Sequence, residues 1–139
     1  MQMVLDPNWA QLDVIRRIQG RCDAAGVMFW LFGGWGIDAL CGRIRRLHHD
    51  VDLLTALDDR GRFRDAIAPL ATEMPEDTAF KLRFIASGVQ CDTRFFRALA
   101  DGTLVLDLDA NDPCVYPTPA DSFPVTLNGD LGFPCRAIS

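Results

Sequence analysis

A glycine turn followed by an Asp-x-Asp pair constrains the fold of this chain more than any other feature. Gly33 and Gly34 follow an apolar run, 27–32, and Asp50 and Asp52 come seventeen and nineteen residues after Gly33. A run of that length is too short for a helix and indicates a buried strand. Apolar residues directly after the second aspartate indicate another strand entering a core. On such a strand, carboxylates at i and i+2 share one face, about 6.5–7 Å apart at the backbone.

This pairing of features indicates nucleotide chemistry. A glycine turn that opens a helix can hold phosphate oxygens on backbone N–H groups. Two carboxylates on one strand face can share a divalent cation. Each feature is common by itself, because most glycine pairs only make turns and a lone Asp-x-Asp is usually a solvated strand end. Their order and spacing in one segment are what point to phosphate and metal together.

The remaining pattern predicts an α+β fold with one mixed β-sheet flanked by helices. Helical spacing or start and stop signals predict helices over 6–25, 35–40 and 58–73, the last closed by Pro75. The apolar run predicts a strand over 27–32, and the later patterns predict strands over 50–55, 80–86, 89–96 and 103–109. Ser87-Gly88 and Asp101-Gly102 are the turn signals between the later strands. Five of the eight prolines crowd the last 27 residues, where we expect loop with short edge strands at most.

Composition bounds the environment and the partners. At 139 residues the chain fits one domain, and no apolar run approaches the ~20 residues of a membrane span. The net charge of −5 argues against a general nucleic-acid binder and is compatible with a cationic or neutral small partner. Five cysteines without a Cys-x-x-Cys pair, and no secretory leader, predict free thiols in the cytoplasm.

The glycine-to-aspartate segment resembles the signature of the lincosamide and aminoglycoside 2″-nucleotidyltransferase family, within the DNA polymerase β-like nucleotidyltransferase superfamily. The resemblance covers about a sixth of the chain closely, and the predicted element order extends it loosely to the C-terminus. It implies the polymerase β-like fold. The matching positions are Gly33-Gly34-Trp35, Ile37-Asp38, Gly42-Arg43, Arg46, His48 and Asp50-Val51-Asp52-Leu53.

The resemblance implies a role for each part of the segment. Asp50 and Asp52 would hold Mg²⁺ against the triphosphate of ATP or another NTP. Gly33 and Gly34 would meet the phosphates through backbone N–H groups. The reaction would be in-line transfer of a nucleoside monophosphate, AMP if the donor is ATP, to a hydroxyl, with pyrophosphate leaving.

Such enzymes also use a third carboxylate as metal ligand, base or both, and we predict Asp92. Strand alternation places it on one face with Gln90 and Arg94. The alternative is a surface carboxylate paired with Arg94.

Asp107 and Asp109 compete for this role and, with Asn111, imitate the start of an EF-hand loop. That pattern fails because Asp112 stands where glycine is needed and Thr118 where the bidentate Glu belongs. We therefore interpret this pair as a solvated strand end.

The basic connector Arg43–His49 offers further contacts. Arg46 is a credible phosphate contact, although the arginines would also suit a solvated connector. The resemblance places His48 at the edge of the nucleotide site. As metal ligands, His48 and His49 lack a third partner, and adjacent residues on a strand point to opposite faces. We assign nothing to His49, expect Trp35 to be structural, and leave open whether Asp38 caps its helix or orients the Arg46 region.

Family members continue into a C-terminal helical segment that helps to form the acceptor pocket, whereas this sequence ends at Ser139. We expect a single nucleotidyltransferase domain over 1–139 without that segment, and a homodimer would supply the missing wall.

The expected function is Mg²⁺-dependent nucleotidylation of a small antibiotic-type acceptor, aminoglycoside or lincosamide, as in antibiotic resistance. The alternative is a nucleotide-binding or antitoxin-like interaction module of the same fold. Transfer to a protein side chain is a third reading. Three carboxylates around one metal favour the enzyme.

Overall fold

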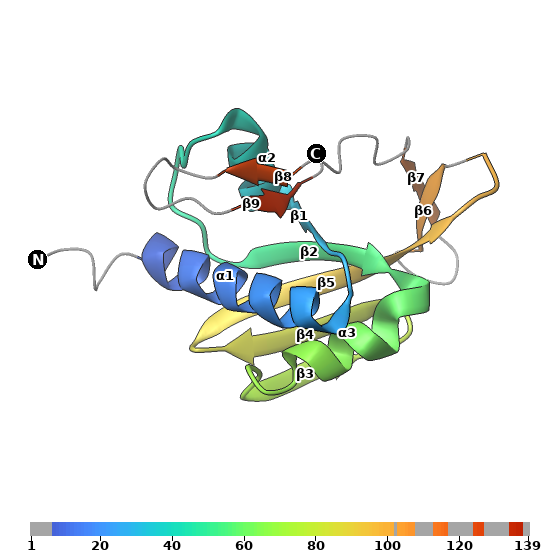
Figure 1. The fold of residues 1–139 in the computed structure, drawn as a ribbon, viewed down its shortest axis with the longest axis horizontal. Helices are drawn as coiled ribbons and strands as arrows, with labels where there is room; N and C mark the ends of the chain where they lie inside the picture. The colour runs from blue at the N-terminus through green and yellow to red at the C-terminus, as the bar shows by residue number, and fades with distance from the viewer. Residues whose placement is uncertain (1–6, 102, 108–112, 117–123, 127–133, 138–139) are drawn as a thin grey trace, which may run out of the picture.

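The computed structural model describes residues 7–101, 103–107, 113–116, 124–126 and 134–137 (Figure 1). Its helices are α1 (Pro7–Ala25), α2 (Gly33–Cys41) and α3 (Arg60–Ile67), the last preceded by the 3-10 turn η2 (Leu57–Asp59). The strands in the first half are β1 (Trp30–Phe32), β2 (Val51–Ala56) and β3 (Glu73–Asp77). The later strands are β4 (Lys81–Ala86), β5 (Val89–Ala98), β6 (Leu104–Asp107), β7 (Pro113–Tyr116), β8 (Pro124–Thr126) and β9 (Pro134–Arg136).

A mixed sheet in the order β1-β2-β5-β4-β3 forms the centre of the fold. β2 and β5 run parallel, whereas β1–β2, β4–β5 and β3–β4 are antiparallel pairs. β6 pairs with β5 and with β7, and β8 and β9 form a small second sheet that contacts α2 and β1 (Figure 1). The prediction of an α+β fold with a mixed sheet flanked by helices is confirmed.

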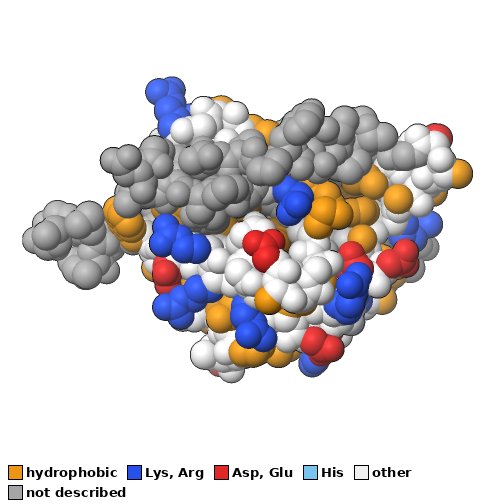
Figure 2. Space-filling model, viewed as in Figure 1, with side chains coloured by type: hydrophobic (Ala, Val, Ile, Leu, Met, Phe, Trp, Pro, Cys, Tyr) orange, Lys and Arg blue, Asp and Glu red, His pale blue; other side chains and the backbone are white. Residues whose placement is uncertain are grey.

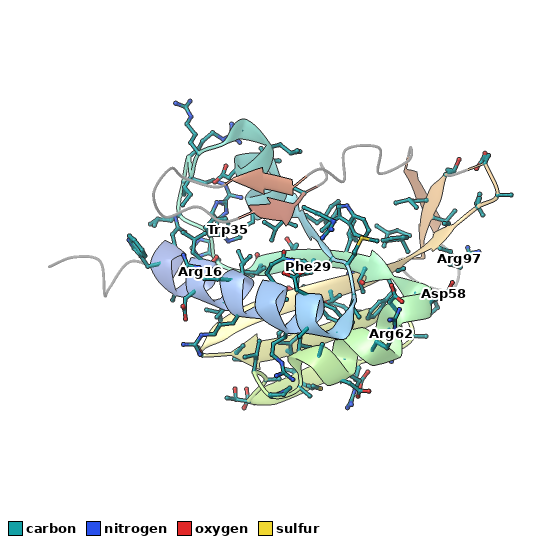
Figure 3. All side chains as sticks on the ribbon, viewed as in Figure 1. Arg16, Phe29, Trp35, Asp58, Arg62 and Arg97 are labelled. Carbon is teal, nitrogen blue, oxygen red and sulfur yellow. The ribbon has the colours of Figure 1, made fainter. Side chains whose placement is uncertain are left out.

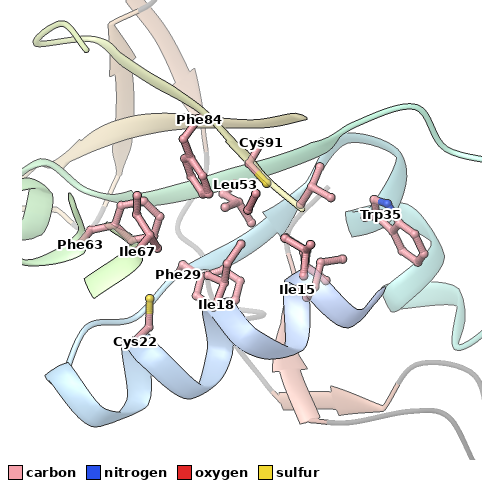
Figure 4. Packing of buried hydrophobic residues seen from close by; sticks show 14 of the residues in the cluster. Ile15, Ile18, Cys22, Phe29, Trp35, Leu53, Phe63, Ile67, Phe84 and Cys91 are labelled. Atoms are coloured by element: carbon pink, nitrogen blue, oxygen red, sulfur yellow. The ribbon is translucent and has the colours of Figure 1, made fainter. Parts of the chain in front are cut away.

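Helices α1 and α3 cover one face of this sheet and bury its apolar side chains (Figure 4). Ile15 and Ile18 of α1 meet Leu53 and Phe84 of the sheet, and all four side chains are fully buried. Side chains alternate between the two faces of a strand. The residues on either side of Leu53 and Phe84 therefore point to the opposite face, which carries the candidate site.

Two predicted elements differ from the structure. The glycines do not precede the second helix but form its first turn, because Gly33 enters α2 with a left-handed φ of +62° that glycine adopts without strain. The predicted helix over 58–73 was wrong beyond Ile67, since Glu73–Asp77 forms the edge strand β3. Its pairing with β4 is irregular between Glu73 and Glu76, around Pro75. Proline donates no N–H and is tolerated at an edge or a bulge.

The hairpin between β4 and β5 is as predicted. Ser87 and Gly88 both have positive φ, of 50° and 77°. Positive φ at both central residues is typical of the two-residue turn whose twist matches that of paired strands. The proline-rich end also forms short strands as expected, within the residues that the structure describes.

The surface facing the viewer in Figure 2 intersperses basic and acidic side chains over the helices. Among the described residues, no helix is long and apolar enough to cross a bilayer. Cys22, Cys41 and Cys91 are free thiols, and burial is the main cause that raises the pKa of both Cys22 and Cys91 to about 12.

Candidate active site

Three carboxylates converge on the sheet face opposite α1 and α3. Asp52 of β2 and Asp92 of β5 are direct neighbours across the parallel pair, and Asp50 immediately precedes β2. One oxygen of each carboxylate lies within 4.8 Å of the other two. A hard divalent cation binds oxygen at about 2.0–2.6 Å, so its ligands lie no more than roughly 4–5 Å apart. The cluster therefore has the chemistry and nearly the spacing to hold one such cation.

The pKa of Asp52 is raised within this cluster. Burial, followed by the charges of Asp50 and Asp92, raises the pKa of Asp52 from 3.8 to about 6. Lys81 and Arg94 act in the opposite direction, but more weakly. A cation between the carboxylates would remove the repulsion that raises this pKa.

Asp92 is held from two sides. Its Oδ1 accepts a hydrogen bond from Arg83 Nε at 2.7 Å, and its Oδ2 accepts one from Gln90 Nε2 at 3.1 Å. Burial alone would raise the pKa of Asp92, but these hydrogen bonds outweigh it and keep the pKa below its ordinary value. The alternative of a surface carboxylate paired with Arg94 was wrong, because Asp92 is 9% exposed and pairs with Arg83 of β4.

The two glycines allow the backbone to approach the charged groups closely. A Cβ built on Gly33 would lie 2.5 Å from Asp52 Oδ2. A Cβ built on Gly34 would collide with the Arg46 guanidinium and lie 2.8 Å from His48 Nδ1. The structure thus brings the glycines, the carboxylates and the basic connector together as the sequence predicted.

Asp38 holds this connector from α2. Its carboxylate is 1% exposed; Oδ2 accepts hydrogen bonds from His48 Nε2 at 2.6 Å and Arg45 N at 3.1 Å. Oδ1 accepts a third from Arg45 Nε at 3.1 Å. Burial would raise the pKa of Asp38, but its bonds to His48 and Arg45 outweigh burial and lower it. The side chain whose role the sequence left open orients the residues on either side of Arg46.

The first turns of α1 hold the same connector. Asn8 donates to the Arg46 carbonyl and accepts from His48 N–H, both at 2.9 Å. Gln11 donates to the His48 carbonyl and accepts from Trp35 Nε1, both at 2.6 Å. Sequence reasoning missed Asn8 and Gln11, because their partners lie 24 to 40 residues away and no local pattern identifies them.

Trp35 is structural, as predicted. It is 1% exposed, and its ring centroid lies 4.4 Å from that of His48. Figure 3 shows it near the N-terminal half of α1.

The other sequence candidates lie apart. His49 and Arg43 are exposed. Asp107 ends β6, whereas Asp109 and the rest of the EF-hand-like run lie outside the described residues.

A cavity of about 300 Å³ opens beside the carboxylates. Asp52 and Asp92 form part of its wall. The other described residues that line it are Phe32, Leu53, Lys81, Arg94 and Leu106.

Adding one methyl group at Gly34 is expected to destabilise the protein by about 1–3 kcal/mol, the usual cost of overpacking. Arg46 can swing away from an alanine there, but Asp38 and Trp35 hold the His48 ring in place. Urea unfolding of Gly34→Ala measures the effect. Gly20→Ala is the matched control, since no atom lies within 4 Å of a Cβ at this exposed helical position. We expect the control to gain about 0.5–1 kcal/mol, and equal effects of the two substitutions would contradict the close approach.

Comparison with known proteins gives consistent results. The sequence profile of the family described as aminoglycoside-2″-adenylyltransferase matches residues 14–138. A 2″-aminoglycoside nucleotidyltransferase from Escherichia coli is 33% identical over 67 residues, which are 48% of this chain and 38% of that protein. A protein of the same description from Klebsiella pneumoniae matches to the same extent. The match thus spans well under half the length of these relatives.

Solved structures share the fold. The crystal structure of ANT(2″)-Ia in complex with adenylyl-2″-tobramycin is 21% identical, with a TM-score of 0.65, and the likeness covers 92% of this chain and 70% of that one. The lincosamide antibiotic adenylyltransferase LnuA, bound to lincomycin, is 20% identical, with a TM-score of 0.69, and covers 90% of this chain and 79% of its own. The polymerase β-like nucleotidyltransferase fold is therefore confirmed.

Proposed function

This chain belongs to the aminoglycoside-2″-adenylyltransferase family, and we propose that it is a Mg²⁺-dependent nucleotidyltransferase that moves AMP from ATP onto a hydroxyl of a small molecule. The observation that carries the proposal is the convergence of Asp50, Asp52 and Asp92 within 4.8 Å, next to the glycine turn. A pure binding module has no need of three carboxylates in one place.

Each group of residues has a part in the proposed reaction. Asp50, Asp52 and Asp92 hold Mg²⁺, which when bound stabilises charge on the attacking and leaving oxygens. Gly33 and Gly34 bind the phosphates through backbone N–H groups at the start of α2.

The connector supplies two further contacts. Arg46 pairs with a phosphate, as guanidinium groups commonly do. His48, buried beside Gly34, lies at the edge of the nucleotide site.

Asp92 also serves as the base. It is one of the three carboxylates of the cluster, and carboxylates are among the side chains that accept protons as general bases. As the acceptor oxygen bonds to the α-phosphorus, its proton passes to Asp92. The bond from the α-phosphorus to the bridging oxygen breaks, and pyrophosphate leaves.

The reference acceptors are an aminoglycoside and a lincosamide, by analogy with the relatives. We treat residues 1–139 as one nucleotidyltransferase domain. We also propose a homodimer as the working assembly, which light scattering of the purified protein would test.

Incubation with labelled ATP, Mg²⁺ and either tobramycin or lincomycin tests the function. We expect an acceptor whose mass increases by one AMP, detected by mass spectrometry. Asp50→Asn should weaken Mg²⁺-dependent ATP binding by at least about tenfold, since it removes one ligand charge from the cation. If ATP binds but no acceptor gains a nucleotide, the nucleotide-binding module becomes the better description. Wild-type ATP binding by the variant would contradict the role of Asp50.

A further inference from the structure

The strand register arranges the site face into three successive rows. Asp52, Asp92 and Arg83 are neighbours across β2, β5 and β4. One same-face step further along these strands, Leu54, Arg94 and Lys81 are neighbours. Beyond them, Ala56, Phe96 and Leu106 form an apolar row across β2, β5 and β6. The site face therefore changes from the carboxylate row to the basic row and then to the apolar row. Successive rows are about 6.5–7 Å apart, the length of two residues of a strand.

The glycine turn lies on the other side of the carboxylate row. Phe32 pairs with Asp52 in the antiparallel β1–β2 pair, so Gly33 and Gly34 continue away from Leu54. If the phosphates bind at the glycines, the part of the site beside Arg94, Lys81 and Leu106 is free to bind the acceptor. The cavity beside the carboxylates reaches these residues, because Lys81, Arg94 and Leu106 all line it.

The charge in this part of the cavity is positive, although the whole chain carries −5. Lys81 Nζ lies 3.8 Å from both Glu76 Oε1 and Asp92 Oδ1, so it is partly neutralised. Arg94 forms no ion pair of 4.0 Å or less with any carboxylate in the described part of the chain. A cation bound at the carboxylates would neutralise the negative charge of Asp52 and Asp92. A positively charged acceptor would then meet Arg94 and Lys81 as like charges, which is how binding sites reject a ligand.

We propose that Arg94, assisted by Lys81, acts as a charge filter: it repels acceptors that carry several positive charges. The preferred acceptor then has few positive charges and also carries an apolar group. The apolar group would lie against Phe32 and Leu106, which line the same cavity. A neutral or weakly basic hydroxyl compound is then the better acceptor, and a polycation is the poorer one. This inference rests on the proposed function and specifies the acceptor class of its site.

Binding to the full chain, saturated with Mg²⁺ and α,β-methylene ATP, tests the filter without requiring turnover. Calorimetric titration compares lincomycin, as the weakly basic probe, with tobramycin, as the polycationic one. We expect lincomycin to bind at least about tenfold more tightly, the discrimination that one or two like charges give in a partly screened cavity. Arg94→Glu should move the affinity ratio toward tobramycin by at least about tenfold.

Arg62→Glu is the control, because it makes the same charge change on α3, which covers the opposite face of the sheet (Figure 3). It should leave the ratio unchanged. Three results would overturn the filter. The wild type could bind tobramycin more tightly than lincomycin, it could bind neither probe, or Arg94→Glu could leave the affinity ratio unchanged. A loss of α,β-methylene ATP affinity in Arg94→Glu as large as the change for the acceptors also overturns it, since Arg94 would then belong to the nucleotide site. Absence of AMP transfer while the ratio behaves as expected would refute the proposed function alone.

Discussion

Replacing Asp52 with asparagine is expected to abolish nucleotidyl transfer and to stabilise the metal-free protein at neutral pH. Loss of one carboxylate from the proposed metal site should lower kcat/KM by at least about a thousandfold, because the metal supplies several kcal/mol of charge stabilisation in the transition state. The stability gain follows from the raised pKa of Asp52, about 6 compared with an ordinary value of 3.8. The folded chain binds this proton more tightly than the unfolded chain does.

This raised pKa fixes the pH range of the effect. In the wild type, the free energy of unfolding falls as pH rises from about 4 to about 6, and the loss persists above that. A pKa difference of this size corresponds to at most roughly 3 kcal/mol, and partial exposure of Asp52 reduces the expected loss to about 1–2 kcal/mol. The variant should match the wild type below pH 4 and exceed it by that amount at pH 7.

Urea unfolding from pH 4 to pH 8 in the presence of EDTA measures the difference. Asp58→Asn is the control, because it removes an exposed carboxylate of η2 outside the cluster, and it should not reproduce the stability gain of Asp52→Asn at pH 7. Added Mg²⁺ should stabilise the wild type more than Asp52→Asn, because a ligand that binds only the folded state shifts unfolding by mass action. A metal-free Asp52→Asn protein that is less stable than the wild type at pH 7 would refute this account of the cluster.

The second large effect is expected at Asp38, which holds the basic connector through Arg45 and His48. Asp38→Ala should cost about 3–5 kcal/mol of folding free energy, the usual penalty for removing one partner from a buried polar pair. His48 Nε2 and Arg45 would lose the hydrogen bonds that the carboxylate accepts. Because the pKa of Asp38 is lowered, its contribution is present at neutral pH and is lost as pH falls through the folded-state pKa.

Asp13→Ala provides the comparison for Asp38→Ala in urea unfolding at pH 7. Asp13 forms an ion pair with Arg17 on α1, with side chains 50% and 57% exposed, so its removal should cost well under about 1 kcal/mol. If the two variants unfold at the same urea concentration, Asp38 does not hold the connector. Nucleotide affinity of Asp38→Ala should also fall, since Arg46 and His48 would lose their fixed position over Gly34.

Local pattern was sufficient for the parts of the site that lie in one segment. The period of a strand already places Asp50 and Asp52 on one face, and the apolar residues that follow show that the strand enters a core. Asp92, 40 residues after Asp52, lies beside the pair as expected, but that expectation came from the family resemblance, and strand alternation indicated only the face on which Asp92 lies. The prediction failed over residues 68–73, because the helix ends at Ile67 and the chain pairs with β4 from Glu73 onward, which outweighs the local helical signal.

Spacing along the chain was enough to predict the fold class, the carboxylate pair and the glycine turn, and the family followed from the resemblance of that one segment. Which side chains meet across the fold depends on how the helices and strands pack. Arg83 pairs with Asp92 since β4 lies next to β5, and Asn8, Gln11 and Asp38 hold the connector since α1 and α2 pack around it. Such partners are set by strand order and helix packing, and the free energy that selects them comes from burial of the whole core rather than from any local segment.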